Sequence, residues 1–398
     1  MSQGTAVNTR NVKGRRPLRF DTLAQMLREV ERLEASEHAG TLRRLGKASI
    51  ARPRTLARMP KTILPDARVS PRFAGISTFA RYPRLEDVLP ENAPVDWAIY
   101  GVPMDAGVSY RPGARFGPRA IRDASQYVKR YHLQHNIDVC ATLSLADAGD
   151  APVAPFSIND TLDLVESFAS SLITAPAASP NTRLFAIGGD HSISYANIRA
   201  TYSRLGEPTG GIALVHFDAH LDTVDSLWGE NYSHASPFRR VIEEGFVDPR
   251  RMISIGLRGP LNTIDDLTFV KQSNVTLVTC DDLARASAPP TPYQTVPRGT
   301  INVTAIDAFL NRIGKQPAYI TFDIDCIDPA FAPGTGTPCP GGLTSAEALD
   351  LLRRLAGVNV AGADVVEVLP DRDPAGITAL LAGHIMFEIL ALDAFNRR

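Results

Sequence analysis

From about residue 95 onward, short apolar runs alternate with longer segments of helical periodicity, and this alternation limits the fold more than any other feature. The predicted strands lie at 97–101, 143–146, 184–188, 212–217, 252–256, 275–279, 319–323 and 364–368. Helical segments lie between most of them, at 158–173, 194–205, 237–244, 305–313 and 345–355. Strands that are apolar on both faces and connected by helices indicate a parallel sheet covered by helices on both sides. The sequence therefore predicts an α/β protein with an eight-stranded parallel sheet.

The first 75 residues differ from the rest, because they hold 16 Lys and Arg but only 6 Asp and Glu. Apolar residues at helical spacing predict one amphipathic helix over 21–33. A segment rich in Pro and Arg, 52–72, is expected to be an extended arm on its own domain or on a neighbouring subunit. No apolar segment follows the basic start, which argues against a secretory signal. A mitochondrial presequence stays open, and a solvated tail is favoured. We therefore divide the chain into a basic N-terminal extension, 1–75, and a main domain, 76–398.

Overall composition excludes several classes of partner. The formal net charge is −1, so nothing indicates binding to nucleic acid or to a membrane surface. The sequence contains no run of 18 apolar residues, so we expect no membrane-spanning helix. The four cysteines are scattered and lack CxxC spacing, which argues against a disulfide framework and a thiolate zinc site. We expect a cytoplasmic protein.

Histidine and aspartate residues follow three of the predicted strands. His191 comes after 184–188, and the segment 218–222 comes after 212–217. Because the carboxyl ends of parallel strands meet at one edge of a sheet, these side chains are expected to converge. Side-chain alternation would let Asp218, His220 and Asp222 point the same way. The same holds for Asp323 and Asp325, which follow the strand near 319–322.

Two imidazoles and four carboxylates in one place indicate a metal site. The carboxylates would repel one another if no cation lay between them. Mixed nitrogen and oxygen ligands suit Mn²⁺, Fe²⁺, Co²⁺, Ni²⁺ or Zn²⁺ better than Ca²⁺ or Mg²⁺. A pair of such ions, roughly 3.5–4 Å apart, can share a water and lower its pKa. A single DxH or DxD is usually a loop cap or a turn, but three such elements at strand ends favour metal binding.

The segments 188–192 (GGDHS), 218–222 (DAHLD) and 323–329 (DIDCIDP) resemble the three signature motifs of the ureohydrolases. This family includes the arginases, the agmatinases and related guanidino hydrolases, and the resemblance covers roughly residues 73–395. Segment 111–122 resembles the agmatinase branch. The resemblance implies a three-layer arginase-like fold with the parallel sheet between helices, with 76–398 as the catalytic domain. It also implies hydrolysis of a guanidino compound to urea and an amine.

The resemblance further implies a role for each candidate ligand. Asp218 and Asp323 would bridge two divalent ions, with Mn²⁺ expected first and Ni²⁺ as the alternative. His191 and Asp222 would complete the ligands of one ion. His220 and Asp325 would complete those of the other.

Two more residues acquire roles from the same resemblance. His234 matches a histidine near the mouth of the active site, where it would shuttle protons. Glu367 matches the carboxylate that orients the guanidinium, holding two N–H groups in a fork. The leaving amine would receive its proton from Asp325 or His234. Alone, Glu367 would suggest a strand-end salt bridge and His234 a helix cap, but beside a metal pair the catalytic roles are favoured.

The substrate is less constrained. Segment 224–233 lacks the Ser-Gly-Asn loop of arginases, so arginine is disfavoured and an agmatinase-like activity is expected. However, Ala235 stands where the family has Gly, and Arg372 where an aromatic is expected, and both would reshape the pocket. A nickel-dependent hydrolase of free guanidine, a methylated guanidine or a biguanide is therefore an alternative.

Three hypotheses from different classes compete with a guanidino hydrolase. One is a non-catalytic assembly subunit, and another is a module that binds a cationic metabolite without turnover. The third is a single-zinc deacetylase, against which the presence of both His191 and Asp325 argues. The expected partners are a small cationic guanidino substrate and further subunits. These subunits would form a homotrimer or homohexamer, or a hetero-oligomer with a paralogous subunit.

Overall fold

The computed structural model describes residues 60–284 and 301–398, which belong to one compact unit, Met59–Arg398. The amphipathic helix predicted over 21–33 lies outside the described residues, as does the start of the predicted arm.

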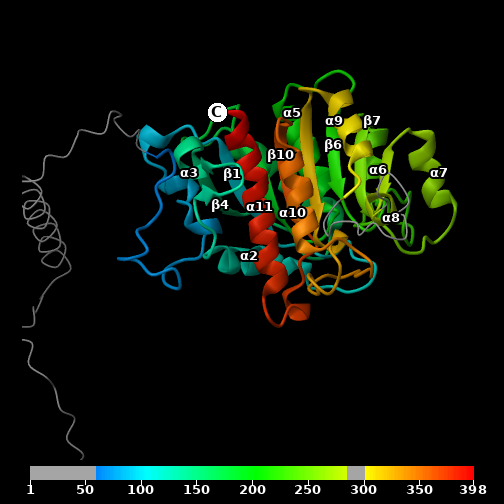
Figure 1. Ribbon diagram of the computed structural model, residues 1–398, viewed down its shortest axis with the longest axis horizontal. Helices are drawn as coiled ribbons and strands as arrows, with labels where there is room; N and C mark the ends of the chain where they lie inside the picture. Colours follow the sequence, from blue (N-terminus) through cyan, green and yellow to red (C-terminus); the bar gives the residue numbers. More distant parts are fainter. Residues whose placement is uncertain (1–59, 285–300) are drawn as a thin grey trace, which may run out of the picture. The chain divides into compact units, whose positions relative to one another are not determined.

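An eight-stranded parallel sheet forms the centre of this unit (Figure 1). In spatial order its strands are β4 (Leu145–Asp150), β1 (Trp97–Val102), β5 (Arg183–Gly188), β10 (Asn359–Val366), β9 (Pro317–Asp323), β6 (Ile212–Phe217), β7 (Val247–Leu257) and β8 (Thr276–Thr279). Every pairing within it is parallel. The predicted α/β architecture is confirmed.

Helices cover both faces of the sheet and complete three layers. One core cluster includes residues of α2 (Gly117–Ser125), α3 (Val139–Thr142), α8 (Cys280–Ala284), α9 (Thr304–Ile313), α10 (Ser345–Arg354) and α11 (Ile377–Asn396). The other includes residues of α4 (Ile158–Leu172), α5 (Ile193–Arg204), α6 (Pro237–Glu243) and α7 (Asp265–Gln272). A small antiparallel pair joins β2 (Tyr131–His132) and β3 (Ile137–Asp138). Single 3₁₀ turns are η1 (Phe79–Arg81), η2 (Leu85–Asp87), η3 (Pro90–Asn92), η4 (Ala114–Phe116), η5 (Ile324–Cys326) and η6 (Pro370–Arg372).

Alternation of side chains along each strand divides the core in two. In β1, Trp97 and Ile99 belong to the first cluster, whereas Ala98 and Tyr100 belong to the second. All six residues of β1 are buried. This two-sided burial explains why the strands appear in the sequence as continuous apolar runs.

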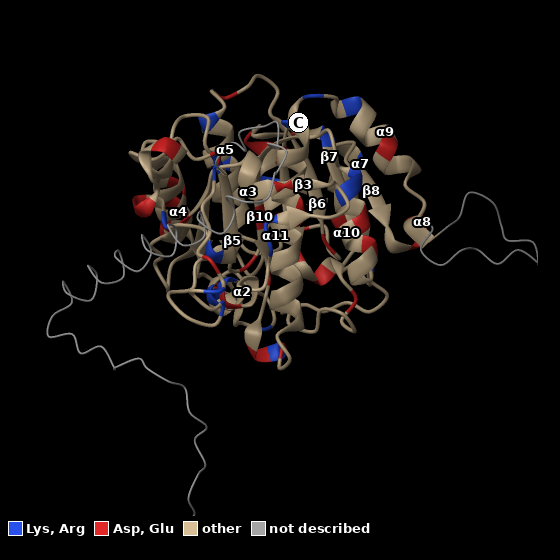
Figure 2. Cartoon of the chain, turned by 60° about the vertical axis from the view of Figure 1, so that its left-hand side comes forward, with Lys and Arg blue, Asp and Glu red and all other residues tan. Residues whose placement is uncertain are grey.

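Helix α11 is long and apolar enough to cross a membrane by length and composition alone. In the structure, however, 83% of its most apolar window is buried. Figure 2 shows charged residues on α4, α9 and α10, whereas α11 is mostly uncharged. Packing inside the protein core therefore accounts for the apolarity of α11.

Some strand boundaries differ from the prediction. Strand β10 begins at Asn359, five residues before the predicted start, and ends at Val366. Asn359 and Gly362 are poor strand formers, so the first half of the strand gave no signal. Its pairing with β5 on one side and β9 on the other overrides that local preference. Similarly, β7 begins at Val247 rather than 252.

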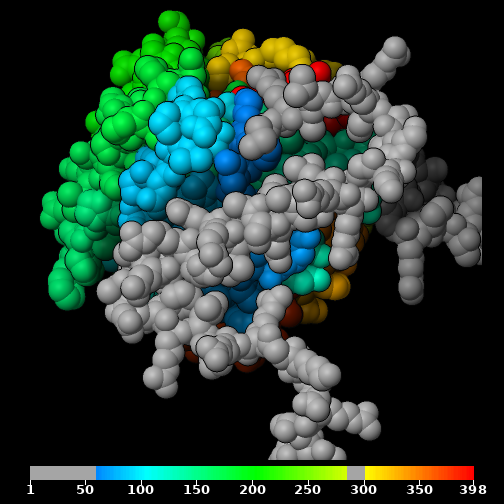
Figure 3. Space-filling view, turned by 90° about the vertical axis from the view of Figure 1, so that its left-hand side faces the viewer, coloured from blue at the N-terminus to red at the C-terminus, as the bar shows by residue number. Residues whose placement is uncertain are grey.

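The first described residues pack against the sheet domain. Thr62 donates its backbone N–H to the carbonyl of Cys140 and its hydroxyl to the carbonyl of Leu143. Figure 3 shows this blue segment against the teal part of the chain. The part of the predicted arm that is described therefore contacts its own chain.

Candidate metal centre and active site

Four neighbouring strands, β5, β10, β9 and β6, bring the candidate residues to one edge of the sheet. His191 follows β5, Asp218 follows β6, and Asp323 is the last residue of β9. Asp325 lies in η5, the turn that continues from β9. The structure thus brings together all six residues that the sequence proposed as metal ligands, as the distances below show.

The first group centres on His191. Its Nδ1 atom lies 2.9 Å from an oxygen of Asp222, 3.1 Å from one of Asp218 and 3.2 Å from one of Asp323. His191 and Asp218 are fully buried, and Asp323 nearly so. Three carboxylate oxygens therefore surround a single imidazole nitrogen.

The second group centres on His220, which is half-exposed. Its Nδ1 atom lies 3.1 Å from Oδ2 of Asp325 and 3.3 Å from Oδ1 of Asp218. Asp218 directs its other oxygen, Oδ2, to His191. One carboxylate therefore joins the two groups, as a ligand that bridges two ions must.

The chemistry of the donor set fits a pair of cations. Nδ1 of His191 is buried and has no hydrogen-bond partner among the described residues, although three carboxylates lie within 3.2 Å. Its Nε2 lies 2.9 Å from the hydroxyl of Thr321. If Nε2–H donates to Thr321, the lone pair of Nδ1 faces the carboxylates, which is the tautomer a metal ligand needs.

The pKa directions show how strongly these charges interact. Burial raises the pKa of Asp218, but the adjacent imidazoles of His191, His216 and His220 outweigh it and hold that pKa well below its usual value. Burial, followed by repulsion from Asp325 and Asp218, raises the pKa of Asp323 well above its usual value. Burial also raises the pKa of Asp325. The site has more negative charge than its histidines can neutralise, and divalent ions would balance it.

Strand alternation is not what aligns the ligands, so that part of the prediction was wrong. Strand β6 ends at Phe217, and residues 218–222 lie in a bend beyond it. Asp222 has a left-handed backbone, with φ of 51°. In the bend, the backbone N–H of His220 donates to Asp218, while that of Ala219 donates to Asp325. A hydrogen-bonded loop therefore places these side chains.

His234 and Glu367 lie beside the ligands as one buried pair. Nδ1 of His234 is 3.1 Å from Oε1 of Glu367, which also accepts the backbone N–H of His191. The other oxygen, Oε2, is buried and has no hydrogen-bond partner among the described residues. Since Oε1 already has two donors, Glu367 offers a ligand one free oxygen rather than the expected fork. Glu367 follows β10 with a left-handed backbone, φ of 63°.

Ser109 holds the far side of His234. Its hydroxyl lies 2.7 Å from Nε2 of His234, and its backbone N–H lies 3.0 Å from the same atom. Burial lowers the pKa of His234, but the adjacent Glu367 outweighs burial and raises the pKa to about 9. The backbone N–H of Ser109 donates to Nε2, so in this geometry the ring proton lies on Nδ1, facing Glu367.

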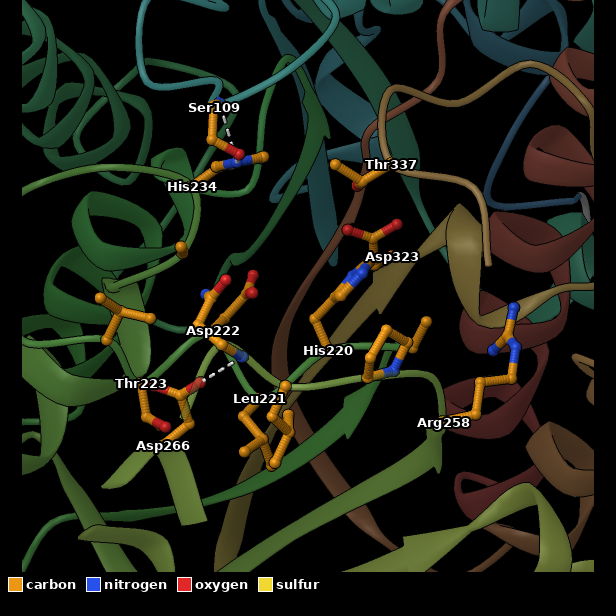
Figure 4. Close-up of a pocket in the computed structure, with 16 residues that line it drawn as sticks. Ser109, His220, Leu221, Asp222, Thr223, His234, Arg258, Asp266, Asp323 and Thr337 are labelled. Atoms are coloured by element: carbon orange, nitrogen blue, oxygen red, sulfur yellow. Dashed lines mark hydrogen bonds between the residues drawn. The ribbon is translucent and has the colours of Figure 1, made fainter. Parts of the chain in front are cut away.

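A cavity of about 270 Å³ lies beside this cluster, and Glu367 itself is not among its lining residues. In Figure 4, His234 and Ser109 lie at one end, and Asp266 and Arg258 lie at the other. Asp222, Asp323 and His220 also line it. So does Ala235, as the sequence suggested, whereas Arg372 is exposed on η6 and is not among the lining residues.

Arg258 and Asp266 differ in the number of hydrogen-bonding atoms that remain available to a substrate. All three guanidinium nitrogens of Arg258 donate to backbone carbonyls, which belong to Gly256, Asp325, Cys326, Ile327 and Cys339. Oδ2 of Asp266 accepts the N–H groups of Asn262 and Thr263, but Oδ1 has no partner in the described part of the chain. The cavity therefore presents a free carboxylate oxygen at this end, and no free arginine N–H.

Sequence reasoning missed several supporting residues. Ser109, Thr321 and Thr337 hold His234, His191 and Asp325, respectively; the Thr337 hydroxyl lies 3.0 Å from Asp325. Asp190 accepts the backbone N–H of Gly107 and so fixes the loop that carries Ser109. Only Asp190 gave a signal, since it lies inside the GGDHS segment, where no role was assigned to it.

Comparison with known proteins gives an independent view of the chain. A sequence profile of the arginase family matches residues 95–392. Proclavaminate amidinohydrolase of Streptomyces clavuligerus is 40% identical over 325 residues, which are 82% of this chain and 95% of that protein. Guanidinopropionase of Pseudomonas aeruginosa is 40% identical, and the match covers 82% of this chain and 94% of that protein. Mitochondrial agmatinase of Gallus gallus is 37% identical, and the match covers 82% of this chain and 88% of that protein.

Solved structures agree with the sequence matches. The proclavaminate amidinohydrolase structure has a TM-score of 0.71 and 38% identity, and the match covers 82% of this chain and 100% of the other. A structure described as a hypothetical agmatinase from Burkholderia thailandensis has a TM-score of 0.68 and 31% identity, covering 81% and 92%.

Proposed function

The chain belongs to the arginase family, and we propose that it cleaves agmatine with water to urea and putrescine, using the cluster around His191 and His220. It is a hydrolase of a guanidino compound, acting on a C–N bond. The comparisons favour hydrolysis of a substituted guanidino compound over hydrolysis of guanidine or a biguanide and over a non-catalytic subunit. The single observation that carries the substrate is the contrast between the free oxygen of Asp266 and the fully engaged Arg258.

Six residues would hold two divalent cations, with Asp218 and Asp323 shared between them. His191 and Asp222 would complete one set, and His220 and Asp325 the other. Bound cations supply the charge that makes a water acidic enough to act as nucleophile near neutral pH. Four carboxylates and two imidazoles favour Mn²⁺, with Ni²⁺ as the alternative.

Glu367 would bind the guanidinium of the substrate. Its buried Oε2 has no partner among the described residues, so an N–H of the substrate would satisfy it. Oε1 is fixed by His191 and His234, which keeps the carboxylate in one orientation. A fixed acceptor holds the guanidinium carbon where water can attack it.

His234 would supply the proton that the leaving amine needs. As water adds to the guanidinium carbon and the C–N bond breaks, the departing nitrogen must gain a proton. Burial lowers the pKa of His234, but Glu367 outweighs burial and so favours a protonated ring, and both His234 and Ser109 line the cavity. Once protonated, the imidazole would donate to the departing nitrogen.

Asp266 would recognise the distal amine of agmatine. Its free oxygen attracts an ammonium group, whereas a substrate carboxylate would find no unused N–H on Arg258. This feature favours agmatine over the guanidino acids on which several relatives act by name.

The test is urea release with agmatine, 4-guanidinobutyrate, arginine, guanidine and dimethylbiguanide, using Mn²⁺-loaded and Ni²⁺-loaded protein. We expect the highest kcat/KM with agmatine. Asp266→Asn should raise KM for agmatine by roughly tenfold and change kcat little, because the ground state and the transition state lose the same contact to the distal amine. A preference for guanidinobutyrate that survives in Asp266→Asn would contradict the substrate assignment. Urea from guanidine or the biguanide alone would contradict it too.

The proposal also covers the cellular compartment, the oligomeric state and the division of the chain. The four cysteines are free, consistent with the cytoplasm proposed from the sequence. Assembly as a homotrimer, a homohexamer or a hetero-oligomer stays a prediction. So does the division into an extension, 1–75, and a catalytic domain, 76–398.

A further inference from the structure

A second cavity lies at the opposite edge of the sheet, where β1, β5 and β10 begin. It has a volume of about 470 Å³. Asp96 precedes β1, Arg183 starts β5, and Asn359 starts β10, and all three line it. The metal ligands follow the carboxyl ends of the strands, so this cavity is separate from the candidate active site.

Three arginines line this second cavity, and two of them have carboxylate partners. Arg183 and Arg397 both contact Asp393, at 2.9 Å each. Arg397 also pairs with Asp96, which is 3.3 Å from the ammonium group of Lys61. Asp393 and Asp96 therefore each neutralise two cationic side chains at once.

Arg204 has no carboxylate partner in the described part of the chain. Its Nη2 donates to the carbonyl of Ala361 at 2.7 Å. Its Nε is buried and has no hydrogen-bond partner among the described residues. A guanidinium with one carbonyl acceptor and no carboxylate partner is costly to bury, and the donors that Arg204 has left on its cavity side are available to an anion.

Electrostatics point the same way. Burial, with repulsion from Arg183 second, lowers the pKa of Arg204 to about 10. Burial also lowers the pKa of Arg183, despite its contact with Asp393. The cavity therefore holds an excess of positive charge that its carboxylates do not neutralise.

Arg204 is the last residue of α5, and this position explains only in part why an arginine without a carboxylate partner lies here. The carboxyl end of a helix attracts a cation. That attraction does not provide an acceptor for Nε, and Nη2 bonds to β10 rather than to the end of α5.

We propose that this cavity binds a small oxyanion, through a phosphate or carboxylate group, with Arg204 and Arg183 as its charged donors. Asn181 and Asn359 lie in the same lining and offer neutral amide donors. Two guanidinium groups and two amides match an anion with several oxygens.

The test is isothermal titration of the metal-loaded protein with inorganic phosphate and, separately, with succinate, at constant ionic strength. We expect one site per chain for at least one of these anions, and the stronger binder identifies the group as phosphate or carboxylate. Arg204→Gln should weaken this binding at least about tenfold, the loss of one charge-assisted hydrogen bond.

Two further variants keep the test decisive. Asn181→Asp places a carboxylate in the lining at an exposed position, and should weaken binding through repulsion even if Arg204→Gln fails to fold. Arg250→Gln removes an exposed arginine near the start of β7 and should leave binding unchanged. The proposal is overturned if neither anion binds the wild-type protein. It is also overturned if binding persists unchanged in the cavity variants, which would locate the anion elsewhere, for example at the metal centre.

Discussion

Nδ1 of His234 lies 3.1 Å from Oε1 of Glu367, so two side chains to which the sequence assigned separate tasks form one buried pair. Glu367 raises the pKa of the imidazole against the effect of burial, and the imidazole fixes the carboxylate. The proposed proton donor and the group proposed to orient the substrate therefore depend on each other. Changing either residue should alter the chemistry of both.

Glu367→Gln keeps the size of the side chain and removes its charge. We expect the metal content to stay at the wild-type level, because Glu367 contacts His191 only through its backbone N–H. Urea release should fall by at least about 100-fold in kcat/KM, since the guanidinium loses its fixed acceptor. Glu230→Gln, an exposed change in a nearby loop, is the matched control. A Glu367→Gln enzyme with wild-type kcat/KM would refute the positioning role.

The His234–Glu367 pair should contribute a pH-dependent part of stability. Burial lowers the pKa of His234, but Glu367 outweighs burial and raises it from 6.5 to about 9 in the ion-free protein. A raised pKa in the folded state stabilises the protein fully below about pH 6.5, and this stability is lost as pH rises through about 9. In chelator-treated protein, the difference in thermal midpoint between wild type and His234→Gln should shrink from pH 6.5 to 9.5. A difference that stays constant would contradict the pairing.

Thr321→Val tests whether the hydroxyl beside His191 fixes its tautomer. The hydroxyl lies 2.9 Å from Nε2, and valine has nearly the same shape without an acceptor. Metal affinity should fall by roughly 10–100-fold, measured by competition with a chelator, as for other residues that hold a ligand in place. Thr304→Val, an exposed threonine at the start of α9, should not change affinity. Unchanged affinity in Thr321→Val would exclude the proposed tautomer control.

Arg258→Lys tests the hydrogen-bond network behind the candidate metal site. Lysine has three donors on one atom and cannot reach the five carbonyls that the guanidinium joins. The loss of hydrogen bonds should cost about 2–4 kcal/mol of stability, seen as a thermal midpoint several degrees lower. Arg250→Lys, at an exposed arginine, is the control. Equal midpoints for the two variants would mean that the carbonyls do not depend on Arg258.

The sequence predicted the sheet and the convergence of the candidate ligands, because both depend on short-range patterns. Two-sided burial makes each strand a continuous apolar run, and the ends of parallel strands share an edge. The mechanism of convergence could not be predicted in this way. The bend after Phe217 is held in part by the N–H of Ala219, which donates to Asp325, 106 positions away. No local pattern in the sequence indicates the left-handed backbone of Asp222.

The same limit applies to Glu367. The sequence placed it inside a strand, but β10 ends at Val366 and the backbone of Glu367 is left-handed. Its N–H donates to the carbonyl of Gly189, a contact across 178 positions of the chain. Likewise, Ser109 lies 125 positions from His234, and no spacing rule connects them.

The most direct test of the account is to count metal ions per chain while measuring urea release from agmatine, in wild type and in Asp218→Ala. Asp218 joins the two ligand groups, so its loss should disturb both. We expect two divalent ions per wild-type chain, and the loss of bound metal and of urea release together in Asp218→Ala. Full metal content with wild-type urea release in Asp218→Ala would contradict the binuclear site on which the proposed function depends.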